Sequence, residues 1–411
     1  MTQSKPATVA LFCDFEEGHL LISCKLAKEL RERGHRVVYL APASAEPTVR
    51  RQGFELVPIF QQLLDGVERS SQVQKAASAQ WFGQLVRGEA LDEVMASLRP
   101  DLVLMLSIYY PEALAVQLRY RVPIVLWAPF CRPSQMTRAA LVESWISNRL
   151  MDLKASDLEA TMKAVTAAGY RFGSFRDLAA LVLKMPELVV MPRAIELPEV
   201  HDANTFYVGT GIDPVRVEEP FPWSEIAGGR YLIYASMGSQ GEIVPDDTRR
   251  FFQAVLGVAA AHPEWQILLS VGRAFDPAEL APLPANLHAS RWMPQLDVLR
   301  HVDLMVTHGG AGTVKEAILL GVPLVVLPLM RDQFEMAKRI VHHRLGVAGK
   351  LAEVTAETLG GLIGEAAGDG ELKGRVATMQ QLFRAEDESS LAVDIVEAVL
   401  GGGGVESLHR A

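Results

Sequence analysis

Short apolar runs alternate with amphipathic segments along the first part of the chain. The run TVALFC at residues 8–13 is followed by LLISCKLAKELRERG, in which apolar residues recur every three or four positions before Gly34. That spacing predicts a helix with one buried face, and a glycine commonly follows the end of a helix. The β-branched run HRVVYLAP comes next. We therefore expect a strand–helix–strand unit of a parallel sheet at the N-terminus.

The same alternation continues, lapses, and then returns. PDLVLMLS and VPIVLWAP predict two more buried strands with the helical EALAVQLRY between them, whereas residues 130–184 have a mostly helical pattern. A second series of strand-like runs follows, again with helical segments between its members: YLIYAS, WQILLSVG, LHASRW, DLMVTH and PLVVLP. The chain is therefore predicted to be an α/β protein with two domains.

The length of 411 residues fits two domains of ordinary size, and an irregular stretch rich in proline and glycine separates the two series. We expect an N-terminal domain at residues 1–209, a linker at 210–228 and a C-terminal domain at 229–385. A last helix is expected at 386–400, packed back on the N-terminal domain.

Charge and composition argue against several kinds of partner. The net charge is -9 without a cluster of lysine and arginine, so nucleic acid is not expected as a partner. Cys13, Cys24 and Cys131 lack the spacing of metal ligands, which predicts reduced thiols and no metal site. No apolar run reaches the roughly 18 residues that span a bilayer. A cytoplasmic protein without a transmembrane segment is expected.

A glycine-rich turn lies between the predicted strand DLMVT and the predicted helix TVKEAILLG. This turn, HGGAGT, contains His308, Gly310, Gly312 and Thr313. Glycines let a ligand approach the backbone, and the first N–H groups of a helix face an anion, so the turn is a candidate phosphate site. It matches neither a P-loop nor the dinucleotide fingerprint. Taken alone, it also fits an ordinary strand-to-helix turn with a capping threonine.

The surrounding span, WMPQLDVLRHVDLMVTHGGAGTVKEAILLGVPLVVLPLMRDQ at residues 292–333, resembles a donor-binding signature. It is similar to that of the UDP-glucosyl/glucuronosyl transferases, a family of nucleotide-sugar-dependent glycosyltransferases with bacterial members that act on natural products. The resemblance implies the GT-B fold, in which two Rossmann-like α/β domains face each other across a cleft.

The resemblance also implies a role for each residue of the signature. In the family a tryptophan stacks on uracil, a backbone group reads the base edge and a glutamine contacts the nucleoside; here these are Trp292, Met293 and Gln295. The histidine and the hydroxyl of the turn hold the diphosphate, an acid binds the ribose, and an acid–amide pair binds the sugar. The implied donor residues are Gly18, Gly238, Ser239, Trp292, Met293, Gln295, His308, Gly310, Gly312, Thr313, Glu316, Asp332 and Gln333.

These roles suit the side chains. An indole offers a flat face on which a base gains about 1 to 3 kcal/mol. A carboxylate such as that of Glu316 accepts hydrogen bonds from two vicinal hydroxyls. The loop MGSQGE after YLIYAS resembles the family loop that faces the phosphates, which is why Gly238 and Ser239 are included.

The N-terminal EEGHLLISCKLAKELRERGHRVVYLAP resembles the opening of the family's acceptor domain. The first histidine there is the family's general base, so His19 is the implied catalytic residue. Its place at the start of a helix is expected to keep the imidazole neutral and able to accept a proton.

The resemblance is incomplete at the partner of His19. The family often has an aspartate after the strand that matches PDLVLMLS, but this chain has Leu106, Ser107 and Ile108 there. Ser107 could orient the histidine instead. The acids that could replace the aspartate, among which the sequence does not choose, are Asp14, Glu16, Glu17 and Glu112.

The resemblance thus implies an inverting, metal-independent transferase that moves a hexose from a UDP-sugar, UDP-glucose above all, to a hydroxyl of a hydrophobic small molecule such as a polyketide. No cofactor other than this co-substrate is expected. Aromatic residues of the N-terminal half either line an acceptor cleft or pack in the core: Trp81, Phe82, Tyr109, Tyr110, Trp127, Phe130 and Trp145.

Two alternatives stay open. A dTDP-deoxysugar transferase would share the fold, but Asp332 and Gln333 favour a fully hydroxylated sugar, because a deoxysugar leaves their polar groups partly unsatisfied. A non-catalytic nucleotide-sugar-binding protein is the second alternative, suggested by the acid that is missing after LVLML.

Overall fold

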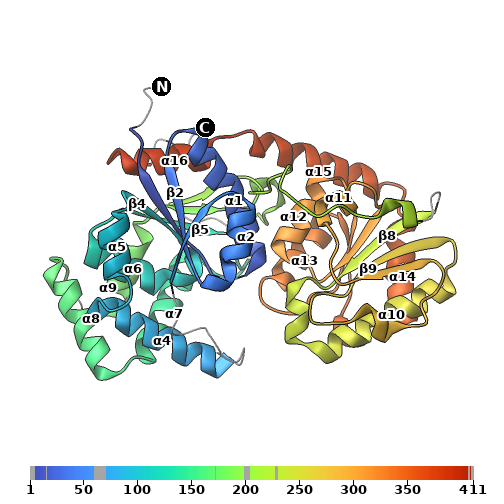
Figure 1. The fold of residues 1–411 in the computed structure, drawn as a ribbon, viewed down its shortest axis with the longest axis horizontal. Helices are drawn as coiled ribbons and strands as arrows, with labels where there is room; N and C mark the ends of the chain where they lie inside the picture. Colours follow the sequence, from blue (N-terminus) through green and yellow to red (C-terminus); the bar gives the residue numbers. More distant parts are fainter. Residues whose placement is uncertain are drawn as a thin grey trace.

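Two parallel β-sheets, one in each half of the chain, organise the computed structural model (Figure 1). The structure describes residues 5–14, 16–59, 71–171, 173–198, 204–226, 230–405 and 408. The sheet order is β3-β2-β1-β4-β5-β6-β7 in the first half and β10-β9-β8-β11-β12-β13 in the second. The two-domain α/β architecture expected from the sequence is therefore confirmed.

The N-terminal sheet forms from the predicted apolar runs and three shorter strands that the pattern did not indicate. Its strands are β1 (Thr8–Phe12), β2 (Arg36–Ala41), β3 (Glu55–Pro58), β4 (Leu102–Leu106), β5 (Ile124–Ala128), β6 (Glu187–Val189) and β7 (Thr205–Tyr207). Every residue of β4 and β5 is buried, as expected of strands covered by helices on both faces. The helices of this half are α1 (Glu17–Glu32), α2 (Glu46–Arg51), α4 (Ser71–Arg87), α5 (Asp92–Leu98), α6 (Tyr110–Tyr120), α7 (Arg138–Met151), α8 (Ala155–Ala167) and α9 (Phe175–Leu183).

The C-terminal sheet contains the five predicted strands and one more. Its strands are β8 (Tyr231–Ser236), β9 (Trp265–Ser270), β10 (Leu287–Ser290), β11 (Leu304–Thr307), β12 (Leu324–Val326) and β13 (Gly346–Ala348). The helices are α10 (Pro245–Ala261), α11 (Gln295–Leu299), α12 (Ala311–Leu319), α13 (Gln333–His342), α14 (Ala356–Gly368), α15 (Leu372–Asp387) and α16 (Leu391–Leu400).

The end of the chain returns from the second sheet to the first, and α16 lies beside the first domain (Figure 1). Arg33, just after α1, pairs with Glu397 of α16 at 2.9 Å. At the end of α15, Asp387 accepts the N–H of Thr210 at 2.6 Å, so the returning chain contacts the segment that joins the two sheets. The residue boundaries of domains and linker drawn from the sequence stay predictions.

Among the described residues, no helix is both long and apolar enough to cross a membrane.

Candidate donor and catalytic site

Both sheets place a histidine at the point where the strand order reverses. In the N-terminal sheet β1 pairs with β2 and β4, and the loop after β1 leads to His19 in the first turn of α1. In the C-terminal sheet β8 pairs with β9 and β11, and His308 follows β11. Open α/β sheets bind ligands beyond the carboxyl ends of their strands at such points. The fold thus places His19 and His308 where a ligand is expected.

His308 is enclosed by two glycines from separate loops. Gly238, after β8, has a φ of 60°, and a Cβ there would lie 2.6 Å from His308 Cε1. At Gly310, before α12, a Cβ would lie 2.6 Å from His308 Nε2. Glycine at both positions leaves room for the ring. Burial lowers the pKa of His308 to about 4, so the ring is neutral at physiological pH and offers one N–H to a ligand.

The glycine-rich turn also lies at the contact between the domains. A Cβ on Gly312, in the first turn of α12, would lie 3.2 Å from Ile22 Cδ1 of α1. Gly309, which the sequence pattern did not single out, has a φ of 83° and would place a Cβ 2.6 Å from Val326 Cγ1. The predicted diphosphate turn is therefore shaped by packing against both α1 and β12.

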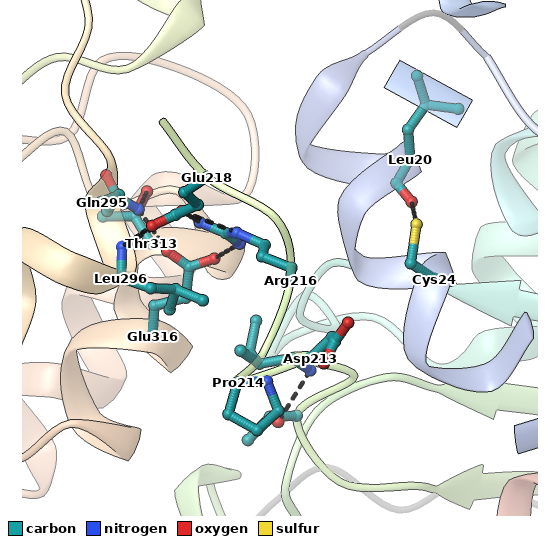
Figure 2. A network of polar contacts seen from close by, with 12 residues as sticks. Leu20, Cys24, Asp213, Pro214, Arg216, Glu218, Gln295, Leu296, Thr313 and Glu316 are labelled. Carbon is teal, nitrogen blue, oxygen red and sulfur yellow. Dashed lines mark hydrogen bonds and ion pairs between the residues drawn. The ribbon is translucent and has the colours of Figure 1, made fainter. Parts of the chain in front are cut away.

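Three predicted donor residues, two for the nucleoside and one for the diphosphate, are brought together at α11 and α12 (Figure 2). Gln295 Nε2 donates to Glu316 Oε2 at 2.6 Å and lies 3.3 Å from Thr313 Oγ1. Arg216, from the segment between β7 and β8, donates to the other carboxylate oxygen of Glu316. Arg216 was missed from the sequence, because it precedes Glu316 by 100 residues and lies outside the signature. Both oxygens of Glu316 are therefore held in place.

Trp292 presents its ring at the predicted base site. The residue is 43% exposed, and the guanidinium of Arg273 lies over the ring, 4.6 Å from its centroid. Met293, the next residue, is buried. An exposed indole suits base stacking, and Arg273 adds a cation–π contact that no pattern in the sequence indicated.

The acid–amide pair lies at the N-terminus of α13. Gln333 Oε1 accepts the N–H of Leu329 at 2.8 Å and that of Met330 at 2.9 Å, so a sugar hydroxyl would meet the amide nitrogen of this side chain. Asp332 is half-buried; burial raises the pKa of its carboxyl, and the positive charge of His19 opposes that rise. The neighbouring residue, Arg331, pairs with Glu16 of the loop before His19 at 2.8 Å, so Asp332 and His19 belong to the same region of the domain interface.

His19 pairs with an acid from its own loop. Its Nδ1 lies 2.9 Å from Asp14 Oδ2 and 3.0 Å from Asp14 Oδ1. Its Nε2, on the other side of the ring, is 3.8 Å from Glu16 Oε2. Asp14 is buried and holds the orientation of the imidazole. It occupies the role of the aspartate that is absent after β4.

The other candidates for this role have different surroundings. Glu16, Glu17 and Glu112 each pair with an arginine at 2.8 to 3.1 Å. Ser107 is fully buried at the end of β4. The structure thus selects Asp14 from the candidates that the sequence left open.

The charge of His19 differs from the expectation. Burial disfavours a charged ring, but the charge and hydrogen bond of Asp14, with the charges of Glu16 and Asp332, outweigh it and raise the pKa of His19 to about 9. The prediction of a neutral imidazole is therefore wrong for the protein without bound substrates. Three carboxylates, two from the loop before His19 and one from the other domain, outweigh the effect of the helix N-terminus.

Known proteins resemble the chain along nearly its whole length. Oleandomycin glycosyltransferase of Streptomyces antibioticus is 28% identical over 419 residues, which cover 97% of this chain and 92% of that protein. NDP-glycosyltransferase YjiC of Bacillus subtilis is 28% identical over 399 residues, covering 93% and 95%. The solved structure of the glycotransferase of kitacinnamycin has a TM-score of 0.75 at 26% identity, covering 96% and 99%.

Residues 218–400 match the family described as UDP-glucoronosyl and UDP-glucosyl transferase. The chain is a glycosyltransferase, and its C-terminal half resembles this family. The structural match confirms the GT-B fold of this glycosyltransferase, and its relatives include enzymes of natural-product pathways. The roles assigned to individual site residues stay predictions.

The acceptor side of the glycosyltransferase contains fewer aromatic rings than the sequence allowed. The ring of Phe130 lies 6.3 Å from that of His19, and Tyr109 is half-buried with its ring 5.4 Å from Phe12. Trp145 is exposed on α7. The other four are buried in the core, which supports the core-packing interpretation for Trp81, Phe82, Tyr110 and Trp127.

Two predicted donor residues, Gly18 and Ser239, are exposed. Gly18 lies in the first turn of α1 beside His19, and a Cβ there would meet nothing within 4 Å. Ser239 begins a short 3-10 helix, Ser239–Ile243, after β8. Their contribution to donor binding stays a prediction.

Proposed function

We propose that this glycosyltransferase moves a hexose, glucose above all, from a UDP-sugar to a hydroxyl of a hydrophobic small molecule, with inversion and without a metal ion. The observation that carries the proposal is the pair of His19 and Asp14, set close to Asp332 of the other domain. An acceptor hydroxyl near Nε2 of His19 would then face a sugar held by Asp332. Base and donor groups meet at the domain interface.

The donor would lie along the C-terminal domain from base to sugar. Uracil would stack on Trp292, the ribose hydroxyls would donate to Glu316, and the sugar would bind at Asp332 and Gln333. The diphosphate would lie between them at the N-terminus of α12, where backbone N–H groups and the helix dipole favour negative charge. His308 would add one N–H to the departing diphosphate, which supplies leaving-group stabilisation from the protein itself.

The transfer step follows from this placement. Neutral His19 accepts the hydroxyl proton at Nε2 while Asp14 accepts the hydrogen bond from Nδ1 and stabilises the imidazolium that forms. The acceptor oxygen attacks the anomeric carbon as its bond to the diphosphate breaks. Attack opposite the leaving group inverts the configuration at that carbon.

The test measures UDP release and product mass with UDP-glucose and a panel of hydrophobic hydroxylated acceptors, with dTDP-sugars in parallel. We expect His19→Ala to lower kcat by about 10²- to 10⁴-fold, because general-base catalysis contributes about that much, and to leave UDP affinity unchanged. Asp14→Asn should lower kcat in the same direction. The matched control is His342→Ala, at an exposed histidine of α13.

Transfer by His19→Ala at the wild-type rate across the panel would refute the base assignment. The parallel donors address the alternative dTDP-deoxysugar transferase. A non-catalytic binding protein would bind UDP yet form no product with any pair; the His19–Asp14 pair argues against it, because the acid that seemed absent is supplied by the loop after β1.

A further inference from the structure

Arg216 connects the segment between the two domains to the predicted ribose site (Figure 2). Its side chain is 7% exposed. Nη2 donates to Glu218 Oε1 at 2.6 Å and Nε to the same oxygen at 2.9 Å, while Nη1 donates to Glu316. One buried guanidinium therefore donates hydrogen bonds to two acids, one from its own segment and one from α12.

These contacts close a ring of hydrogen bonds around the nucleoside side of the site. Glu218 Oε2 accepts the N–H of Leu296 at 3.1 Å and that of Asp297 at 3.3 Å, at the N-terminus of α11. The first residue of α11, Gln295, donates to Glu316 at 2.6 Å. Glu316 is thus oriented by Arg216 directly and by α11 through Gln295.

The two acids, Glu218 and Glu316, need a positive charge between them. Glu316 and Glu218 are both largely shielded from water, and two such carboxylates repel each other unless a cation lies between them. Burial lowers the pKa of Arg216, but the charges of Glu316 and Glu218 more than offset this and raise it. The guanidinium therefore stays charged and donates hydrogen bonds to both acids.

Other residues besides Arg216 also attach its segment to the C-terminal domain. Arg300 Nη2 donates to the carbonyl of Pro214 at 2.8 Å, and Trp223 Nε1 donates to Asp297 at 2.9 Å. These contacts anchor the segment on both sides of Arg216. Attachment of the segment therefore does not by itself account for the contact between Arg216 and Glu316.

We propose that Arg216 is a positioning residue that orients Glu316 toward both ribose hydroxyls of the donor and so makes the enzyme prefer a ribonucleoside diphosphate to its 2′-deoxy counterpart. The inference rests on the proposed function, in which Glu316 binds the ribose. Arg216 donates to one carboxylate oxygen of Glu316 and Gln295 to the other, so the orientation of the carboxylate, and with it the direction of its remaining lone pairs, is fixed. A 2′-deoxy ligand lacks one of the two ribose hydroxyls and leaves one acceptor position of Glu316 without a hydrogen bond, which lowers the affinity about ten- to a hundredfold.

The experiment compares the affinities of UDP, 2′-deoxy-UDP and dTDP by calorimetry. Wild type is expected to bind UDP about ten- to a hundredfold more tightly than 2′-deoxy-UDP. Arg216→Met should bring this ratio close to one, mainly by weakening UDP, and Arg216→Lys should restore part of it because the charge remains. Arg300→Met, which removes a tether without touching Glu316, should keep the wild-type ratio.

A double-mutant comparison separates positioning from general disruption. In a Glu316→Gln background, adding Arg216→Met should leave the ratio unchanged, since the residue through which Arg216 acts has been altered. An unchanged ratio in Arg216→Met and Arg216→Lys, or equal weakening of UDP and 2′-deoxy-UDP, overturns the inference. Wild type that binds none of the three nucleotides overturns the proposed function instead.

Discussion

At the scale of single residues, His19 shows how neighbours decide what a side chain does. The same carboxylate that orients the ring also favours its protonated form, so the free enzyme holds the candidate base with both protons at neutral pH. Before His19 accepts a proton from the acceptor, it must lose one. Activity should therefore depend on pH in the direction set by the raised pKa.

Because only neutral His19 acts as a base, kcat/KM should rise with pH up to about 9, the pKa to which Asp14, Glu16 and Asp332 raise this histidine despite its burial. Glu16→Gln removes one of these negative charges, which lowers the pKa and moves the acidic limb to lower pH. The check is a pH profile of kcat/KM. Glu17→Gln is the matched control, since Glu17 pairs with Arg273 and should leave the limb in place. A flat profile between pH 6 and 9 would contradict the assignment.

At the scale of elements, the loops after β8 and β11 form one structure around His308. The glycines that enclose the ring come from both loops, so neither loop shapes the predicted phosphate site alone. A methyl group added at either glycine would lie 2.6 Å from an atom of the imidazole.

Gly310→Ala tests this enclosure. Its φ of -58° suits alanine, so the backbone is not strained and the cost arises from the contact with Nε2 of His308. We expect UDP affinity to fall about ten- to a hundredfold, the worth of a hydrogen bond to a charged group, when the ring is displaced. Calorimetry measures the loss. Gly364→Ala, in α14 with open space around it, should keep UDP affinity and stabilise the fold by about 0.5 to 1 kcal/mol. Unchanged affinity in Gly310→Ala would mean that the ring does not contact the nucleotide.

The elements also show where prediction from the sequence succeeds. Long apolar runs such as those of β4 and β5 were found because burial on both faces leaves a continuous signal. β6 was missed because it has three residues and begins with Glu187, a buried acid that pairs with Arg132 and Arg138. An acid in so short a segment resembles a loop until its partners are known.

The functional site was also predictable where its residues are close together in the sequence, and not where they are far apart. Residues of the contiguous signature, such as Gln295 and Glu316, were indicated together and do lie together. Arg216 and Arg273 were not, because the signature residues that they contact, Glu316 and Trp292, lie far from them in the sequence and are reached only through the fold. Asp14 was one of several acids near His19, and only geometry distinguishes it from them.

At the scale of the whole molecule, the two domains are joined by charged contacts of very different burial. Arg331–Glu16 and Arg273–Glu17 cross the interface near the predicted site, with arginines more than half exposed. Arg339 of α13 reaches instead into the first domain, where Nε donates to Glu196 at 2.9 Å and Nη2 to the carbonyl of Arg132 at 2.7 Å, and it is fully buried.

This difference predicts unequal effects on stability. Arg339→Met should lower the free energy of unfolding by about 3 to 5 kcal/mol, because it leaves the carboxylate of Glu196 buried without its cation. Arg331→Met, which breaks an exposed pair, should cost at most about 1 kcal/mol. Urea denaturation of both variants at neutral pH provides the comparison. Adding Glu196→Leu to Arg339→Met should recover part of the loss; equal stability of the two single variants would contradict the argument.

The contact of Thr210 with Asp387 has a mechanical consequence. The polypeptide passes between the domains twice, once in each direction, and Asp387 binds both the N–H and the hydroxyl of Thr210, at 2.6 and 2.5 Å, where the two passages meet. Because the two connecting segments are held together at one place, they are expected to act as a single hinge. Any rotation of one domain against the other would then displace atoms in proportion to their distance from that hinge, so the far rim of the interface would travel most while both sheets stay intact.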